Sequence, residues 1–232
     1  GLSQSGVIQA FNRHGRREML EWCDKAYDHV QELDKEFSDW LCVPRSVRTT
    51  SIKPSGTVSL LNGSTPGIHY PEAEYYIRRI RFSIGNAILK AIEEAGYHVE
   101  KDAYSPNTMV ASFPVHEPFF QKGKNEASMW EQLEIAAAYQ HYWADNSVSV
   151  TVTFKADEAK DIKTALEMYE SRLKAVSFLR FQETGYEQAP YEPITKEQYE
   201  EMTKNITPID RIETEEQGAG TVFCDGDSCE IA

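Results

Sequence analysis

A strand–helix–strand pattern between residues 147 and 181 most constrains what this chain can fold into. Residues 147–154 read Ser-Val-Ser-Val-Thr-Val-Thr-Phe, an alternation of β-branched and small polar residues that predicts a strand. Residues 157–172 carry apolar side chains at helical spacing, and residues 173–181 predict a second strand. Because a helix that links two consecutive strands lays them side by side in parallel, the pattern predicts an α/β fold with a right-handed crossover.

Further elements are predicted on the N-terminal side of this unit. Three helices are predicted, over residues 16–40, 72–96 and 126–143. Extended runs are predicted at 49–52 and 108–115. Residues 54–67 hold two Pro and three Gly, so we expect a succession of turns there. Gly96 is expected to end the second of these helices, since glycine is the usual residue after a helix C-terminus.

The composition of the chain changes after Gly185. Residues 188–193 predict a Pro-rich turn, and Thr195-Lys-Glu-Gln198 is a capping-box pattern that predicts a short helix to Lys204. The chain from Asn205 onward is polar, Gly-rich and acidic, which predicts a mobile tail. The sequence therefore divides into three parts, which we place at residues 1–185, 186–204 and 205–232.

Charge and composition limit the possible functions. The 232 residues hold 24 Lys and Arg against 37 Asp and Glu, a formal net charge of −13. This argues against a protein that binds the backbone of a nucleic acid polymer, although a nucleotide phosphate needs only a local cluster of N–H groups. No apolar run approaches the length of a membrane helix, which predicts no membrane partner. Four Cys are too few for a disulfide scaffold, which favours the cytoplasm.

Two cysteines near the C-terminus, Cys224 and Cys229, are candidates for redox chemistry. They lie five positions apart with Gly226 between them, so the chain can turn tightly enough to join them. Thiol–disulfide exchange needs access and mobility, which a tail provides. Two incidental thiols, or half of a zinc site, are the alternatives, and zinc lacks further ligands nearby. We assign no role to Cys23 and Cys42 beyond a structural one.

The loop after the extended run 49–52 is a candidate anion-binding site. Ser55, Gly56 and Thr57 can direct backbone N–H groups and two hydroxyls at one anion. An ordinary polar turn would have the same composition, so the residues alone leave both readings open. No Walker or Rossmann pattern is present. The six His are scattered without metal-ligand spacing, and we predict no metal site.

Three collinear segments together resemble the catalytic chains of ribonucleotide reductases. Residues 49–71, TTSIKPSGTVSLLNGSTPGIHYP, resemble the substrate-phosphate loop of that family and the segment after it. Residues 145–154, DNSVSVTVTF, resemble a strand of its catalytic barrel, and residues 224–229, CDGDSC, resemble its C-terminal cysteine pair. The resemblance extends over essentially the whole chain.

The class within the family follows from the same comparison. The class that imports its radical from a diiron subunit carries adjacent tyrosines where this chain has Ser177 and Phe178. The anaerobic class ends in a glycyl-radical motif that is missing here. The chain thus resembles the adenosylcobalamin-dependent class II enzymes, of the monomeric type that uses triphosphates. The radical-bearing Cys-Gly-Glu motif of the family is also missing, so we expect the C-terminal portion of such an enzyme.

This resemblance implies a fold, a cofactor and partners. The fold would be the C-terminal half of a ten-stranded α/β barrel, over residues 1–185, followed by the redox tail. The complete enzyme would use adenosylcobalamin to generate a thiyl radical that reduces a ribonucleoside triphosphate. The implied triphosphate contacts are Ser55, Gly56, Thr57, Val58 and, more weakly, Ser59. Cys224 and Cys229 would re-reduce the active site with electrons from a thioredoxin-type protein, and a separate N-terminal fragment is a further candidate partner.

Two alternatives remain open from the sequence. The chain could be an inactive, acidic α/β interaction module derived from such an enzyme. A module of that kind would not need the tail cysteines, and the presence of both favours the enzyme. It could also be a fragment of another ribonucleotide reductase class, against which Ser177 and Phe178 argue.

Overall fold

The computed structural model describes residues 1–56, 58–181 and 187–209 of the chain. Four strands, all parallel, form its central layer: β1 (Leu2–Ser3), β2 (Thr50–Ser51), β6 (Thr151–Phe154) and β7 (Ser177–Arg180). β1 pairs with β2 and β6 pairs with β7, and a parallel bridge between Ile52 and Val148 joins the two pairs. The order β1-β2-β6-β7 confirms an α/β arrangement, and the predicted parallel pairing of residues 147–154 with 173–181 is confirmed.

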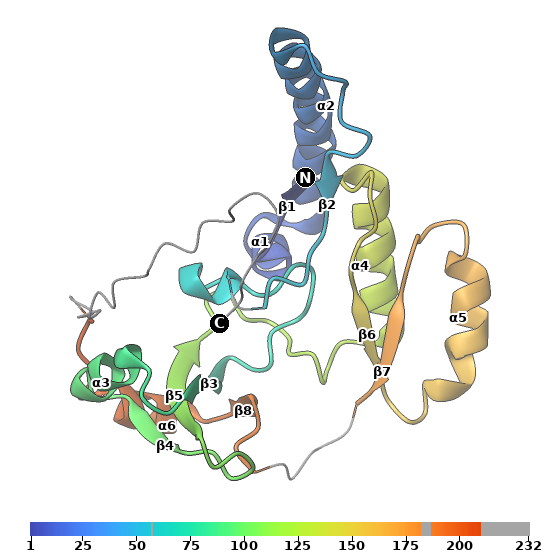
Figure 1. Ribbon diagram of the computed structural model, residues 1–232. Coiled ribbons are helices and arrows are strands. Elements are labelled where there is room, and N and C mark those ends of the chain that lie inside the picture. The colour runs from blue at the N-terminus through green and yellow to red at the C-terminus, as the bar shows by residue number, and fades with distance from the viewer. Residues whose placement is uncertain (57, 182–186, 210–232) are drawn as a thin grey trace.

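Helices flank the parallel strands (Figure 1). They are α1 (Val7–His14), α2 (Arg16–Leu41), α4 (Met129–Tyr142) and α5 (Ile162–Tyr169), the last preceded by a 3-10 turn at Ala159–Asp161. The predicted helices at 16–40 and 126–143 are therefore confirmed. The core lies between these helices and the strands, and among its most deeply buried side chains are Val7, Ile52, Met129, Leu133, Tyr139, Val148 and Val152. Burial of this apolar surface is what holds the helices on the strands.

A second, antiparallel sheet forms a separate layer. Its strands are β3 (Tyr75–Ser83), β4 (His98–Lys101), β5 (Thr108–His116) and β8 (Tyr191–Pro193), in the order β4-β5-β3-β8. The helices α3 (Ala87–Glu94) and α6 (Lys196–Thr203) lie beside it in Figure 1. β3 and β5 pair over nine residues each, from Tyr75 opposite His116 to Ser83 opposite Thr108. This long ladder ties residues 75–116 into one unit.

The predicted helix over residues 72–96 is wrong. Its first half is strand β3, and only residues 87–94 are helical. The sequence YYIRRIRFS is rich in aromatic and β-branched residues, which pack well on a pleated sheet. Gly85, with φ of 86°, and Asn86, whose side chain caps the amide of Ile88, then separate the strand from α3. The helix does end as predicted, because Gly96 has a φ of 91° and donates its N–H to Glu93.

Residues 187–204 contribute to the antiparallel sheet. The Pro-rich turn predicted at 188–193 includes the three-residue strand β8, which pairs with β3 at the sheet edge. An edge position tolerates Pro193 because its missing N–H need not face a partner. The capping box predicted at Thr195 is confirmed, since its hydroxyl accepts from the amide of Gln198 and the Gln198 side chain accepts from the amide of Thr195.

Candidate functional site

The loop 54–59 leaves the carboxyl end of β2, where loops of parallel sheets commonly bind ligands. Ser55 has a φ of 36°, and its hydroxyl oxygen lies 2.6 Å from that of Ser5. The Ser55 carbonyl accepts from both the amide of Ser59, at 3.0 Å, and its hydroxyl, at 2.7 Å. These bonds turn the loop back on itself and start the 3-10 helix Ser59–Asn62.

The predicted phosphate contacts fall into two groups. Ser55, Gly56 and Val58 lie on the open side, with Val58 69% exposed and no atom within 4 Å of the place a Gly56 Cβ would take. The hydroxyl of Ser59 is buried and bonded within the loop, which leaves it a supporting part rather than a free donor. Thr57 lies outside the described residues.

Gln9, on α1, fixes the chain just beyond this loop. Its Nε2 donates to the carbonyl of Gly63 at 2.9 Å, and its Oε1 accepts from the amide of Thr65 at 3.1 Å. The same Nε2 also donates to Glu117, at the end of β5. One amide thus ties a helix, a loop and a strand end together. Sequence reasoning missed both Gln9 and Ser5, because their partners lie about 50 or more residues away.

Glu117 is a buried carboxyl group in this network. It is 3% exposed, and burial raises its pKa to about 7, while the hydrogen bond from Gln9 acts in the opposite direction. Burial, reinforced by the negative charge of Glu117, also raises the pKa of Tyr76. A carboxyl with a raised pKa can hold a proton near neutral pH.

Two side chains replace strand partners along the edge of β6 that faces the loop. The amide of Thr151 donates to Nε2 of His69 at 3.2 Å, while Nδ1 of His69 lies 3.0 Å from the carbonyl of Pro66. Burial lowers the pKa of His69, although its bond to Pro66 acts in the opposite direction. Further along, the amide of Gln132 pairs with both the N–H and the carbonyl of Thr153, at 2.9 Å each. The two parallel pairs therefore separate at this end, next to the candidate loop.

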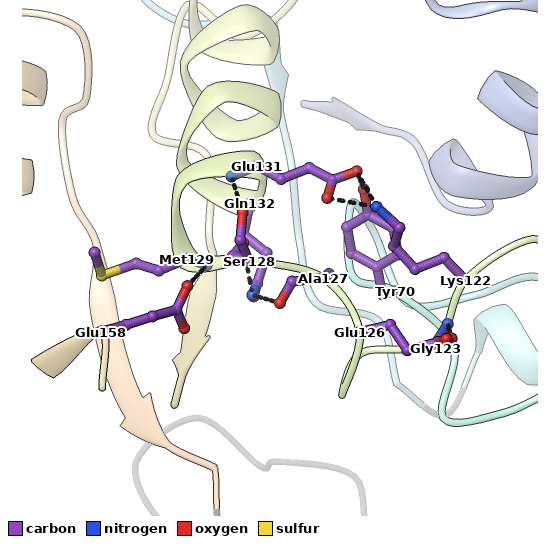
Figure 2. Close-up of polar contacts among 10 residues, drawn as sticks. All are labelled: Tyr70, Lys122, Gly123, Glu126, Ala127, Ser128, Met129, Glu131, Gln132 and Glu158. Carbon is purple, nitrogen blue, oxygen red and sulfur yellow. Dashed lines mark hydrogen bonds and ion pairs between the residues drawn. The ribbon is translucent and has the colours of Figure 1, made fainter. Parts of the chain in front are cut away.

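The N-terminus of α4 is held by a second polar cluster (Figure 2). Glu131 accepts a hydrogen bond from the Tyr70 hydroxyl at 2.7 Å and from Nζ of Lys122 at 2.8 and 3.1 Å. Glu158, which follows β6, accepts from the amide of Met129 at 2.9 Å, and Ser128 caps the helix. Tyr70 belongs to the segment 49–71, so this cluster ties the end of that segment to α4.

The cysteines differ in their surroundings. Cys23 is buried, and burial raises the pKa of its thiol even though bonds with Tyr139 and Gln4 oppose this. A thiol with a raised pKa is a poor nucleophile, which fits a structural role. Cys42 is exposed, and Cys224 and Cys229 lie outside the described residues. Within residues 1–56, 58–181 and 187–209, no group of three potential metal ligands occurs, and no helix is long and apolar enough to cross a membrane.

Comparison with known proteins gives a consistent result. No family model matches the chain. A protein from Dictyostelium discoideum named "Probable adenosylcobalamin-dependent ribonucleoside-triphosphate reductase" is 41% identical to this chain. The match covers the whole of this chain and 31% of the Dictyostelium protein. The adenosylcobalamin-dependent ribonucleoside-triphosphate reductases of Euglena gracilis and Lactobacillus acidophilus are 41% and 37% identical, covering 99% and 91% of the chain and 33% and 30% of themselves.

A solved structure has the same fold. The crystal structure of a B12-dependent (class II) ribonucleotide reductase superposes with a TM-score of 0.81 and 31% sequence identity. The match covers 90% of this chain and 33% of that one, so the chain spans about a third of the proteins it resembles. Over the third of their length that it spans, the chain is therefore similar in both sequence and fold to adenosylcobalamin-dependent (class II) ribonucleotide reductases.

Proposed function

We propose that this chain forms the C-terminal part of an adenosylcobalamin-dependent ribonucleoside-triphosphate reductase. The observation that carries the proposal is the set of four parallel strands, β1-β2-β6-β7, with the loop 54–59 at their carboxyl end. Both outer strands of this set lack a further strand partner among the described residues, as half of a ten-stranded barrel would. The rest of the barrel would come from the remaining two thirds of the family's length.

The substrate triphosphate binds, in this proposal, at Ser55, Gly56, Thr57 and Val58. The positive φ of Ser55 and the open space beside Gly56 support this, because they let backbone N–H groups converge on an anion without a side chain in the way. Ser59 holds the loop in shape through its two bonds to the Ser55 carbonyl. Ser5 would join the site through its contact with Ser55.

The tail 205–232 is proposed to carry electrons between a thioredoxin-type protein and the active site through Cys224 and Cys229. The support is chemical: a dithiol five residues apart can close to a disulfide while it transfers two electrons and two protons. The parallel strands, the antiparallel sheet and helix α6 would stay in place while the tail moves.

Four hollows among the described residues have volumes of about 300 to 590 Å³ and are open to solvent, and none of these four is large enough to enclose a corrin with its nucleotide arm and adenosyl group. We therefore propose no cofactor contact on this chain, and the cofactor that the relatives' names specify would be held with the remaining part of the enzyme.

The decisive experiment joins the chain to its missing part. The chain alone, given a ribonucleoside triphosphate, adenosylcobalamin and dithiothreitol, should form no deoxyribonucleotide. Fused to the part of the Dictyostelium relative that it does not cover, it should become active. In that enzyme Thr57→Val should raise KM about tenfold or more, since a hydrogen bond to a charged group contributes roughly 1.5–3 kcal/mol. Activity of the chain alone, or an unchanged KM, would contradict the respective proposal.

The tail is tested separately in the same fusion. Changing both Cys224 and Cys229 to Ser should abolish multiple turnovers with thioredoxin and spare a single turnover of the pre-reduced enzyme. Dithiothreitol should partly restore turnover, because a small thiol reaches a site that a protein reductant cannot. Normal turnover with thioredoxin would show that the pair is not the relay.

A further inference from the structure

A hollow of about 300 Å³ lies at the end of the parallel strands opposite to loop 54–59. Its lining includes Arg48, two residues before β2 begins, and Lys174, three residues before β7 begins. Loop 54–59, by contrast, follows β2. The hollow is also lined by Tyr27 of α2, by Gln140 and His141 at the end of α4, and by Asp145. The hollow is thus built by four separate parts of the chain and is distinct from the proposed triphosphate site.

Basic groups converge on this hollow although the chain as a whole carries a net charge of −13. Arg48 is exposed and has no hydrogen bond or ion pair with any described residue. Within the same part of the chain, the ring nitrogens of His141 are also without hydrogen bonds. Lys174 donates one N–H to the carbonyl of Asp145 at 2.5 Å, which anchors its ammonium at the rim and leaves two N–H groups free.

The only acidic residue in the lining is already engaged. The carboxylate of Asp145 accepts from the amides of Thr49 and Thr50, at 2.9 to 3.1 Å, and from the Thr49 hydroxyl at 2.9 Å. Burial opposes the charged form of Asp145, yet these donors hold its pKa below the usual range. This strand end therefore stabilises negative charge, and Asp145 does not serve as the counter-ion of Arg48.

We propose that this hollow binds a phosphate group, with the guanidinium of Arg48 as its main contact and Lys174 and His141 as further donors. The planar fork of Arg48 can donate two parallel hydrogen bonds to phosphate oxygens. The free ammonium hydrogens of Lys174 supply a second cation in the same hollow. The ligand is inorganic phosphate or pyrophosphate, or the phosphate moiety of a nucleotide whose base lies toward Tyr27.

The proposal is tested by calorimetric titration of the 232-residue chain at constant low ionic strength. The ligands are sodium pyrophosphate and ADP. Each ligand should show one equivalent of binding that depends on Arg48, and Arg48→Gln should weaken this binding at least tenfold. Arg45→Gln is the matched control, because it removes a cation three positions away that does not line the hollow; its effect should be below twofold. Equal affinities assign the site to phosphate alone, and tighter binding of ADP assigns it to a nucleotide.

Other variants separate this site from the proposed triphosphate loop. The double variant Ser55→Ala, Thr57→Val should leave the Arg48-dependent binding unchanged. Loss of pyrophosphate binding in that variant but not in Arg48→Gln would place the anion at the loop and overturn the proposal. Equal weakening by Arg45→Gln and Arg48→Gln would show that binding is general charge attraction and not a specific site. Absence of binding at 10 mM pyrophosphate, a concentration on the order of the weakest useful affinities, would refute the proposal outright.

Discussion

Replacing Glu117 with Gln should make the chain more stable at neutral pH. The carboxyl is 3% exposed and its pKa rises from 4.5 to about 7, because burial disfavours the charged form. Between these values the folded chain holds a proton that the unfolded chain has released. The contribution of Glu117 to stability is therefore complete below pH 4.5 and is lost as the pH rises through 7. At about 1.4 kcal/mol for each tenfold change in proton affinity, the loss is roughly 3 kcal/mol.

Gln removes this pH dependence while it keeps the contact. Its side-chain oxygen still accepts from Nε2 of Gln9, as the Glu117 carboxyl does. Urea unfolding of both proteins from pH 4.5 to 8 should show the stability difference growing in favour of Glu117→Gln by about 3 kcal/mol. The exposed Glu201→Gln serves as control and should show no such trend. Parallel pH profiles for wild type and Glu117→Gln would refute the reasoning, because the carboxyl would then be solvated in the folded chain.

Three further substitutions test other parts of the fold. Asp145→Asn places an N–H₂ group against the backbone amides at the start of β2. It should therefore lower the free energy of unfolding at pH 7, measured by urea denaturation, by about 1–3 kcal/mol. The difference from wild type should shrink as the pH falls below the range where Asp145 is ionised. Gly96→Ala should lower stability by about 1–3 kcal/mol, because its φ of 91° disfavours a side chain and the new Cβ would lie 2.6 Å from the carbonyl oxygen of Asn205. Gly56→Ala, with open space around it, should leave the melting temperature nearly unchanged.

The parts of the fold that the sequence predicts are those set by neighbouring residues. The alternation at 147–154 and the helical spacing after it act within a few positions, so the parallel β6–β7 pair follows directly. The turns at 54–67 follow from Pro and Gly in the same way. In both cases the residues that determine the structure are also the residues that form it.

The parts that the sequence does not predict depend on distant partners. Residues 75–83 form a strand because a nine-residue ladder with β5 outweighs their moderate helical spacing. β8 is a strand only because β3 offers it an edge. The contact between Gln9 and Glu117 joins residues 108 positions apart, and neither side chain belongs to a recognisable motif. Tertiary contacts decide all three, although the aromatic and β-branched residues of 75–83 are a local sign of the first strand.

The two edges of the β6–β7 pair differ in how they could recruit a foreign strand. Past Val150, the inner edge of β6 is closed by His69 and Gln132, whose side chains occupy the backbone groups that an added strand would need. The outer edge of β7 pairs with no strand in the described part of the chain. If two copies paired wrongly through β7, each would use the same edge, and the result would be a closed dimer with two-fold symmetry. Fibre growth needs a second long edge, and β1, at two residues, offers very little of one.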